Sequence, residues 1–142
     1  MKLTYEWLDL AQAWADEASS CAKVKVGAAI ITRERDFHCF GANITIPEGC
    51  DGLSCNKILG DGLPHCVSTL HAEIDAIIRA RRDLTGATIF VTRYPCENCA
   101  RAIVAAGISE VVYGRPNEIS DEVKKILQGV KVTHIPFFNP EG

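Results

Sequence analysis

The 142-residue sequence has few of the features that mark membrane, duplex-binding or exported proteins. No stretch approaches the roughly 18 apolar residues that a transmembrane helix needs. Lys and Arg form no long block and the formal net charge is -3, so the diffuse basic surface of a duplex-binding protein is missing. The first residues include Glu6, Asp9, Asp16 and Glu17 and lack the basic start and apolar core of a signal peptide. We therefore expect a cytoplasmic protein without a membrane or nucleic-acid partner.

The composition is that of an ordinary globular protein, with 47% apolar and 23% charged residues. A chain of this length fits one domain with one hydrophobic core, so we expect a single domain over 1–142 with one active site. A small anionic ligand stays open, because two or three local cations are enough to hold a phosphate.

Cysteine is comparatively abundant, with seven residues, two of which form a C-x-x-C pair. The odd number and the missing export signal argue against a disulfide framework. Metal ligation or reduced thiols is the better interpretation.

Hydrophobic periodicity predicts an α/β fold. Apolar residues at three- and four-residue steps predict a first helix over 4–20, and two following apolar runs predict a hairpin. The later alternation of helices and strands is a βαβ pattern, which implies parallel pairing. Glycine and proline punctuate 43–67, which we expect to be a long loop. The predicted strands are 24–32, 37–42, 87–92, 108–113 and 130–134, and the later helices begin near 68, 96 and 120.

Two short motifs carry the candidate chemistry: His71 with Glu73, and Cys96 with Cys99 in the segment Pro95-Cys96-Glu97-Asn98-Cys99. An imidazole and two thiolates suit tetrahedral Zn²⁺ with the fourth position open to water, as in catalytic sites. Cys96 and Cys99 share one side of a predicted helix start, where unpaired N–H groups favour thiolates. A parallel βαβ arrangement would bring both helix starts to the same edge of the sheet.

Glu73 is not expected to be a zinc ligand, because residues two apart on a helix face different ways. It can stand beside the water on the metal, take its proton and pass it to a ring nitrogen and a departing amine. H-x-E followed by P-C-x-x-C is the motif of zinc deaminases. The sequence thus indicates hydrolytic deamination.

Two other interpretations of these residues stay open. The C-x-x-C pair could be redox-active, although that leaves His71 and Glu73 unexplained. A structural zinc ribbon would need a second ligand pair, which Cys50, Cys55, His65 and Cys66 could supply.

At these residues the chain resembles the cytidine deaminase superfamily, and within it the deoxycytidylate (dCMP) deaminases. The zinc motif is specific for the superfamily, whereas the flanking segments point to the sub-family. The matching segments are Val26–Ile31, Gly41–Asn43, His71–Ile77, Gly86–Thr92, Pro95–Cys99, Ala106–Ile108 and Val111–Tyr113.

The resemblance implies a role for individual residues. His71, Cys96 and Cys99 would be the zinc ligands and Glu73 the proton shuttle. The backbone at Ala72 and around Tyr94 and Pro95 would hold the pyrimidine edge. Asn43 would contact the base or the sugar, its alternative being a turn former. Lys23 and Lys25 would bind the 5′-phosphate, their alternative being solvated charges at a strand start.

One segment departs from the resemblance. Many dCMP deaminases have G-Y-N-G where this chain has Gly41-Ala42-Asn43-Ile44, in a loop associated with regulation by dCTP and dTTP. Such regulation, and strict specificity for a monophosphate over dCTP, are therefore open here. Some members of the family hold a second, structural zinc, for which this chain offers Cys21, Cys50, Cys55, His65 and Cys66; reduced buried thiols are the alternative.

The resemblance implies a three-layer α/β/α domain with a five-stranded mixed sheet that hydrolyses dCMP to dUMP and ammonia. The altered segment Gly41-Ala42-Asn43-Ile44 leaves dCTP open as a further substrate. It also implies a homo-oligomer, commonly a hexamer, to which Trp7 and Trp14 could contribute if they are not core residues. The alternatives are a deaminase of cytidine, a guanine-type base or tRNA adenosine, and a non-catalytic zinc scaffold. The charge of -3 disfavours tRNA, and the presence of Glu73 disfavours a scaffold.

Overall fold

The computed structural model describes residues 3–20, 24–45, 57–58, 64–65, 69–116 and 120–136. The helices within these ranges are α1 (Leu3–Ala18), α2 (Ala72–Ala80), α3 (Glu97–Ala105) and α4 (Asp121–Ile126). The main strands are β1 (Gly27–Ile31), β2 (His38–Ala42), β7 (Thr88–Arg93), β8 (Glu110–Arg115) and β9 (Lys131–His134). The shorter strands β3 (Ile44–Thr45), β4 (Lys57–Ile58), β5 (Pro64–His65) and β6 (Thr69–Leu70) form two separate pairs, β3 with β6 and β4 with β5.

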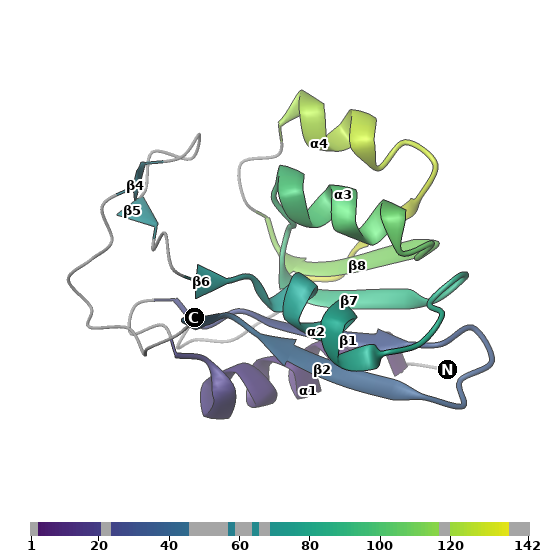
Figure 1. Ribbon diagram of the computed structural model, residues 1–142, viewed down its shortest axis with the longest axis horizontal. Helices are drawn as coiled ribbons and strands as arrows, with labels where there is room; N and C mark the ends of the chain where they lie inside the picture. The colour runs from purple at the N-terminus through teal and green to yellow at the C-terminus, as the bar shows by residue number, and fades with distance from the viewer. Residues whose placement is uncertain are drawn as a thin grey trace.

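The main sheet has five strands in the order β2-β1-β7-β8-β9 (Figure 1). β1 is antiparallel to both of its neighbours, whereas β7, β8 and β9 run parallel. The predicted five-stranded mixed sheet is thus confirmed, as are the antiparallel first pair and the later parallel strands.

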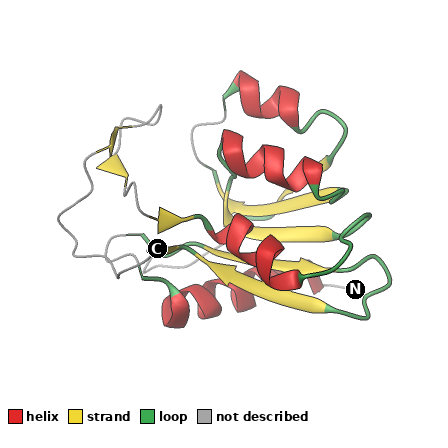
Figure 2. Cartoon of the chain, viewed as in Figure 1, coloured by secondary structure: helices red, strands yellow, loops and turns green. Residues whose placement is uncertain are grey.

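Alternate residues of the strands face two different helical layers, as the pleat of a β-strand requires. Ile30, Ile89 and Val111 point into a core that includes Ala76 of α2 and Ile103 of α3. Their neighbours in sequence, Ala29, Phe90 and Val112, point to the other face, where Leu8 and Ala11 of α1 cover them. Figure 2 shows the helices on both sides of the sheet, so the three-layer prediction is also confirmed.

Two glycines allow helices to approach the sheet closely. A Cβ atom at Gly27 would lie 2.0 Å from the carbonyl oxygen of Ala11 in α1. A Cβ atom at Gly41 would lie 2.3 Å from the carbonyl oxygen of Ala72 and 2.4 Å from the amide nitrogen of Ala76 in α2. Both helices therefore rest on strand backbone where a side chain would not fit.

Some boundaries differ from those predicted, for local reasons. The strand predicted from 24 begins at Gly27, because Val24 and Val26 hydrogen-bond to the side chain of Asn43. The strand predicted over 108–113 spans Glu110–Arg115, because Gly107, with φ at +82°, makes the turn out of α3. Within the described ranges, no helix is long and apolar enough to cross a membrane.

Candidate metal centre and active site

The helices α2 and α3 both begin at the same edge of the sheet. β2 and β7 run in the same direction, since each is antiparallel to β1, which lies between them. α2 lies between β2 and β7 in the chain, and α3 follows β7, so both helices start near the carboxyl ends of parallel strands. Ligands bind at this edge in open α/β sheets. The sequence-based expectation that the two motifs meet here is correct.

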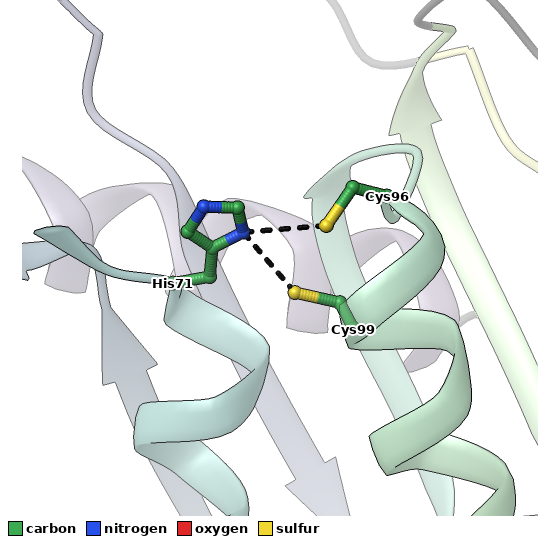
Figure 3. A group of neighbouring side chains, drawn as sticks. All are labelled: His71, Cys96 and Cys99. Carbon is green, nitrogen blue, oxygen red and sulfur yellow. Dashed lines mark hydrogen bonds between the residues drawn. The ribbon is translucent and has the colours of Figure 1, made fainter. Parts of the chain in front are cut away.

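His71 and Cys96 are the residues that immediately precede α2 and α3, and both have extended backbones, with ψ of 151° and 177°. Cys99 follows one turn later and is fully buried. The Nδ1 atom of His71 lies 3.2 Å from the Sγ atom of Cys99 and 3.4 Å from that of Cys96. Figure 3 shows the imidazole of α2 facing both thiols of α3.

The three donor atoms fit a zinc ion. All lie within 4.8 Å of one another, and the N and S separations are near the ~3.5 Å that tetrahedral zinc bonds of about 2.0 and 2.3 Å imply. Two sulfurs and one imidazole are donors that zinc prefers, and three protein ligands leave a fourth position for water. Within the described residues, this is the one group of three or more His, Cys, Asp and Glu side chains that could hold a metal.

The two thiols titrate very differently. The hydrogen bond from Cys99, aided by His71 and opposed by burial, lowers the pKa of Cys96 to about 4. The same hydrogen bond, burial and the charge of Glu73 raise the pKa of the Cys99 thiol far above its ordinary value. Near neutral pH the two thiols of the metal-free protein therefore hold one proton between them. A bound metal cation would displace this proton.

Glu73 lies in the first turn of α2 with only 4% of its surface exposed. Burial raises the pKa of its carboxyl to about 7, although the nearby His71 and a hydrogen bond with Cys99 partly offset this effect. A carboxyl with a pKa near neutrality can both accept and release a proton, as a general acid and base requires. The structure places this carboxyl beside the thiols, and its role as a proton shuttle stays a prediction.

Asp75 is a residue of this region whose role the sequence did not reveal. Its buried carboxylate accepts a hydrogen bond from the backbone N–H of Ala42 in β2, at 3.1 Å. Both of its oxygens also accept from Nε of Arg79, at 2.9 and 3.0 Å. The only signal in the sequence was an acidic residue in a helix that carries the motif.

The proposed substrate-contacting residues are placed as follows. Ala72 and Pro95 are buried beside the zinc ligands in sequence, and Tyr94 is buried against Tyr113 with a ring separation of 4.8 Å. Lys25 is exposed, and its ammonium group donates to the carbonyl oxygen of Ser19 at 3.4 Å.

The side chain of Asn43 is buried and hydrogen-bonded within the chain. Its Oδ1 atom accepts from the amide of Val26 at 2.9 Å and from the hydroxyl of Ser19 at 2.5 Å, and its Nδ2 atom donates to the carbonyl of Val24 at 2.8 Å. Asn43 thus joins the end of β2 to the segment before β1.

The candidates for a second zinc fall mostly outside the described residues. Cys21, Cys50, Cys55 and Cys66 are not described, nor is Lys23, and only the backbone of His65 is described, in β5. Cys39, the remaining cysteine, donates to the carbonyl of Ala76 at 3.4 Å and packs against the core, as expected for a core thiol.

Comparison with known families decides the class of this centre. Residues 1–115 match the model of the "Cytidine and deoxycytidylate deaminase zinc-binding region". The chain belongs to this family. Its His71, Cys96 and Cys99 centre is accordingly a zinc site, and the chain is a deaminase.

Individual relatives of this deaminase are similar over most of its length. It is 38% identical to the deoxycytidylate deaminase of Mycobacterium phage D29, over 70% of this chain and 84% of the relative. It is 31% identical to ComE operon protein 2 of Bacillus subtilis (strain 168), over 81% of this chain, and spans 61% of that relative's length. The crystal structure of cyanophage S-TIM5 dCMP deaminase with dCMP and dUMP superposes with a TM-score of 0.73 at 27% identity, covering 94% and 97% of the two chains.

Proposed function

We propose that this deaminase hydrolyses dCMP to dUMP and ammonia. The observation that carries the proposal is the buried Glu73 carboxyl in contact with a three-donor zinc centre that leaves one position open. Relatives named deoxycytidylate deaminase, and the similar structure that holds dCMP and dUMP, support the choice of substrate.

The mechanism assigns the proton transfers to Glu73. Zinc, when bound, supplies a water that is acidic enough to act as a nucleophile near neutral pH. Glu73 would accept a proton from the attacking water and deliver it to the ring nitrogen N3 of the cytosine, whose C4 takes up the oxygen. It then carries the second proton to the amine, and the C4–N bond breaks to release ammonia. His71, Cys96 and Cys99 would hold the metal at the edge of the sheet where α2 and α3 begin.

The substrate contacts are further parts of this proposal. The buried backbone around Ala72, Tyr94 and Pro95 would bind the pyrimidine edge. Lys23 and Lys25 would attract the 5′-phosphate, and Asn43 would contact the sugar or base. The side chain of Asn43 hydrogen-bonds to Val24 and Val26, the two neighbours of Lys25 in the chain. These bonds fix the segment that carries Lys25 and so support a shared role of Asn43 and Lys25 in binding the nucleotide.

A substitution of Glu73 tests the chemical role. In Glu73→Gln, zinc should stay bound at one equivalent while ammonia release falls by about a hundredfold or more, as expected for loss of a general acid and base. The matched control is Glu122→Gln, which changes an exposed carboxylate on α4 and should leave turnover unchanged. Undiminished turnover in Glu73→Gln would eliminate the mechanism. If the zinc-loaded wild type turned over no amine-bearing base at all, a non-catalytic zinc scaffold would be favoured instead.

A substrate panel tests the specificity. The panel comprises dCMP, dCTP, CMP, deoxycytidine, cytosine, guanine and a tRNA with adenosine in the anticodon loop. Under the proposal, dCMP has the highest kcat/KM, with dCTP as a further substrate. A higher kcat/KM for deoxycytidine than for dCMP would contradict a nucleotide substrate. A higher kcat/KM for guanine or tRNA than for dCMP would show that the target base is not cytosine.

Assembly into a homo-oligomer, a hexamer by family resemblance, and a location in the cytoplasm are also part of the proposal. Trp14 stacks on Phe40 with a ring separation of 5.8 Å and keeps 41% of its surface exposed on α1, which would be the part that contacts another subunit. Trp7 packs against His38, Phe40 and Phe90. Light scattering after size exclusion measures the mass directly. A monomer would contradict the oligomer without affecting the chemistry.

A further inference from the structure

We propose that Arg93 and Arg115 form a subsite for the 5′-phosphate of the substrate, beside the metal centre. This inference rests on the proposed function, since it adds two residues to Lys23 and Lys25 as groups that distinguish a nucleotide from a nucleoside. The two arginines occupy the last positions of the parallel strands β7 and β8. They are not part of the zinc motif or of the lysine pair considered above.

The two residues are direct neighbours across the strand pair. Arg93 is in register with Arg115, and the amide of Tyr94 donates to the carbonyl oxygen of Arg115 at 2.9 Å. Registered residues of neighbouring strands lie on the same face of a sheet. The side chains of Arg93 and Arg115 therefore leave the two adjacent strand ends on the same face of the sheet.

The alternation of residues along each strand identifies that face. Ile89 and Val91 of β7 point to the core under α2 and α3, and Arg93 follows them at the same two-residue interval. Val111 and Tyr113 precede Arg115 in the same way in β8. Both arginines thus lie on the face that holds α2 and α3, whose first residues carry the zinc ligands.

The arginines also share an edge with the metal centre. Arg93 is three residues before Cys96, and three residues of extended chain span at most about 11 Å. An arginine side chain can cover part of that separation, and a nucleotide can cover the remainder. A base at the metal centre would therefore place its 5′-phosphate within reach of Arg93.

The charges at these strand ends favour an anion. Arg79, Arg82 and Arg101 each lie within 4 Å of a carboxylate, but no ion pair in the described part of the chain involves Arg93. A phosphate can accept charge-assisted hydrogen bonds from both guanidinium groups, which are geometrically suited to its oxygens. Both arginines are partly buried, which strengthens the interaction relative to that of an exposed lysine such as Lys25.

The test compares dCMP with deoxycytidine, which lacks only the phosphate. In Arg93→Gln and in Arg115→Gln, we expect kcat/KM for dCMP to fall by about tenfold to a hundredfold, the usual cost of losing a charge-assisted contact. The value for deoxycytidine should stay within about twofold of wild type. Arg93→Lys should recover part of the loss, because it restores the charge without the planar fork. The matched control is Arg101→Gln on the exposed side of α3, which should change neither value.

The outcomes separate this inference from the proposed function. If wild type shows no preference for dCMP over deoxycytidine, the nucleotide substrate itself is wrong and the subsite falls with it. If wild type prefers dCMP and both glutamine variants keep that preference, the subsite alone is wrong. Equal losses for dCMP and deoxycytidine would also overturn it, since they would indicate damage to the metal centre. Zinc content and a thermal melt of each variant identify such damage independently.

Discussion

The carboxylate of Asp75 holds the backbone N–H of Ala42 at 3.1 Å, and so ties α2 to β2 just beyond Glu73. The amide of Asp75 in turn donates to the carbonyl of His71 at 2.9 Å in the first turn of the helix. Asp75 thus connects β2 to the first turn of α2, which carries His71 and Glu73. We expect the positions of the imidazole and the carboxyl to depend on this attachment.

Removing the Asp75 carboxylate should destabilise the protein and weaken the metal centre. In Asp75→Ala, the buried N–H of Ala42 loses its partner, which costs about 1–3 kcal/mol. Asp75→Asn keeps an acceptor for Ala42 and should recover most of that loss. Urea unfolding of the zinc-loaded protein measures the stability, and competition with a chelator measures zinc affinity. Equal zinc affinity in wild type and in Asp75→Ala would show that the attachment does not position His71.

A methyl group at Gly41 should force α2 away from β2. The added Cβ would lie 2.3 Å from the backbone of Ala72, and overpacking of this kind costs about 1–3 kcal/mol. We expect Gly41→Ala to unfold at lower urea concentration and to lose deaminase activity at temperatures where it is still folded. The control is Gly129→Ala, since a Cβ there meets nothing within 4 Å. A Gly41→Ala variant as stable and active as Gly129→Ala would contradict the close approach.

Zinc binding should release one proton, that of Cys99, at about pH 8 to pH 9, where the Glu73 carboxyl with its pKa raised to about 7 is already ionised. The pKa of Cys96 is lowered to about 4, so this thiol is already ionised over that range, whereas the raised pKa of Cys99 keeps its proton in place. Binding therefore displaces the Cys99 proton, and zinc affinity should rise about tenfold per pH unit. Calorimetry in two buffers with different ionisation enthalpies counts the released protons. A Cys99→Ser variant should bind zinc more weakly and with a shallower pH dependence.

The same pKa shifts predict which thiols react in the metal-free protein. Cys96, with its pKa lowered to about 4, is a thiolate at pH 7, whereas burial raises the pKa of Cys39 to about 11 and keeps it a thiol. Thiolates are the reactive species. Iodoacetamide followed by peptide mass spectrometry should show rapid modification of Cys96, slow modification of Cys39, and protection of Cys96 by zinc. Faster reaction at Cys39 than at Cys96 would refute the assignment.

Local sequence predicted the elements and the metal ligands well, for a physical reason. His71, Glu73, Cys96 and Cys99 belong to two short motifs, and each motif sits at a helix start that hydrophobic periodicity indicates. The helix predicted to begin near 68 begins at Ala72 instead, because Thr69 and Leu70 pair with β3 as strand β6. The strand pattern likewise follows from alternation within a few residues. The meeting of the motifs required only the general rule for parallel strands.

Contacts between distant residues were beyond the reach of such patterns. An aspartate on a helix does not show that it will bind the amide of Ala42, 33 residues earlier in the chain. The predicted role of Asn43 came from resemblance, and the structure shows hydrogen bonds to Val24 and Val26 that no local pattern indicates. The pairing of Arg93 with Arg115 depends on the strand register, which side-chain periodicity alone does not determine.

The position of β1 between β2 and β7 bears on how the metal centre assembles during folding. His71 and Cys96 are 25 residues apart, and β1, which separates β2 from β7 in the sheet, precedes both ligands in the chain. The ligands can therefore converge only after β1 has paired with β2 in a local hairpin and with β7 through contacts of long sequence separation, such as Ala28 with Val91, which are slow to form. Zinc cannot nucleate this fold locally as it does in a zinc finger. Metal uptake during refolding would instead report the completion of the sheet.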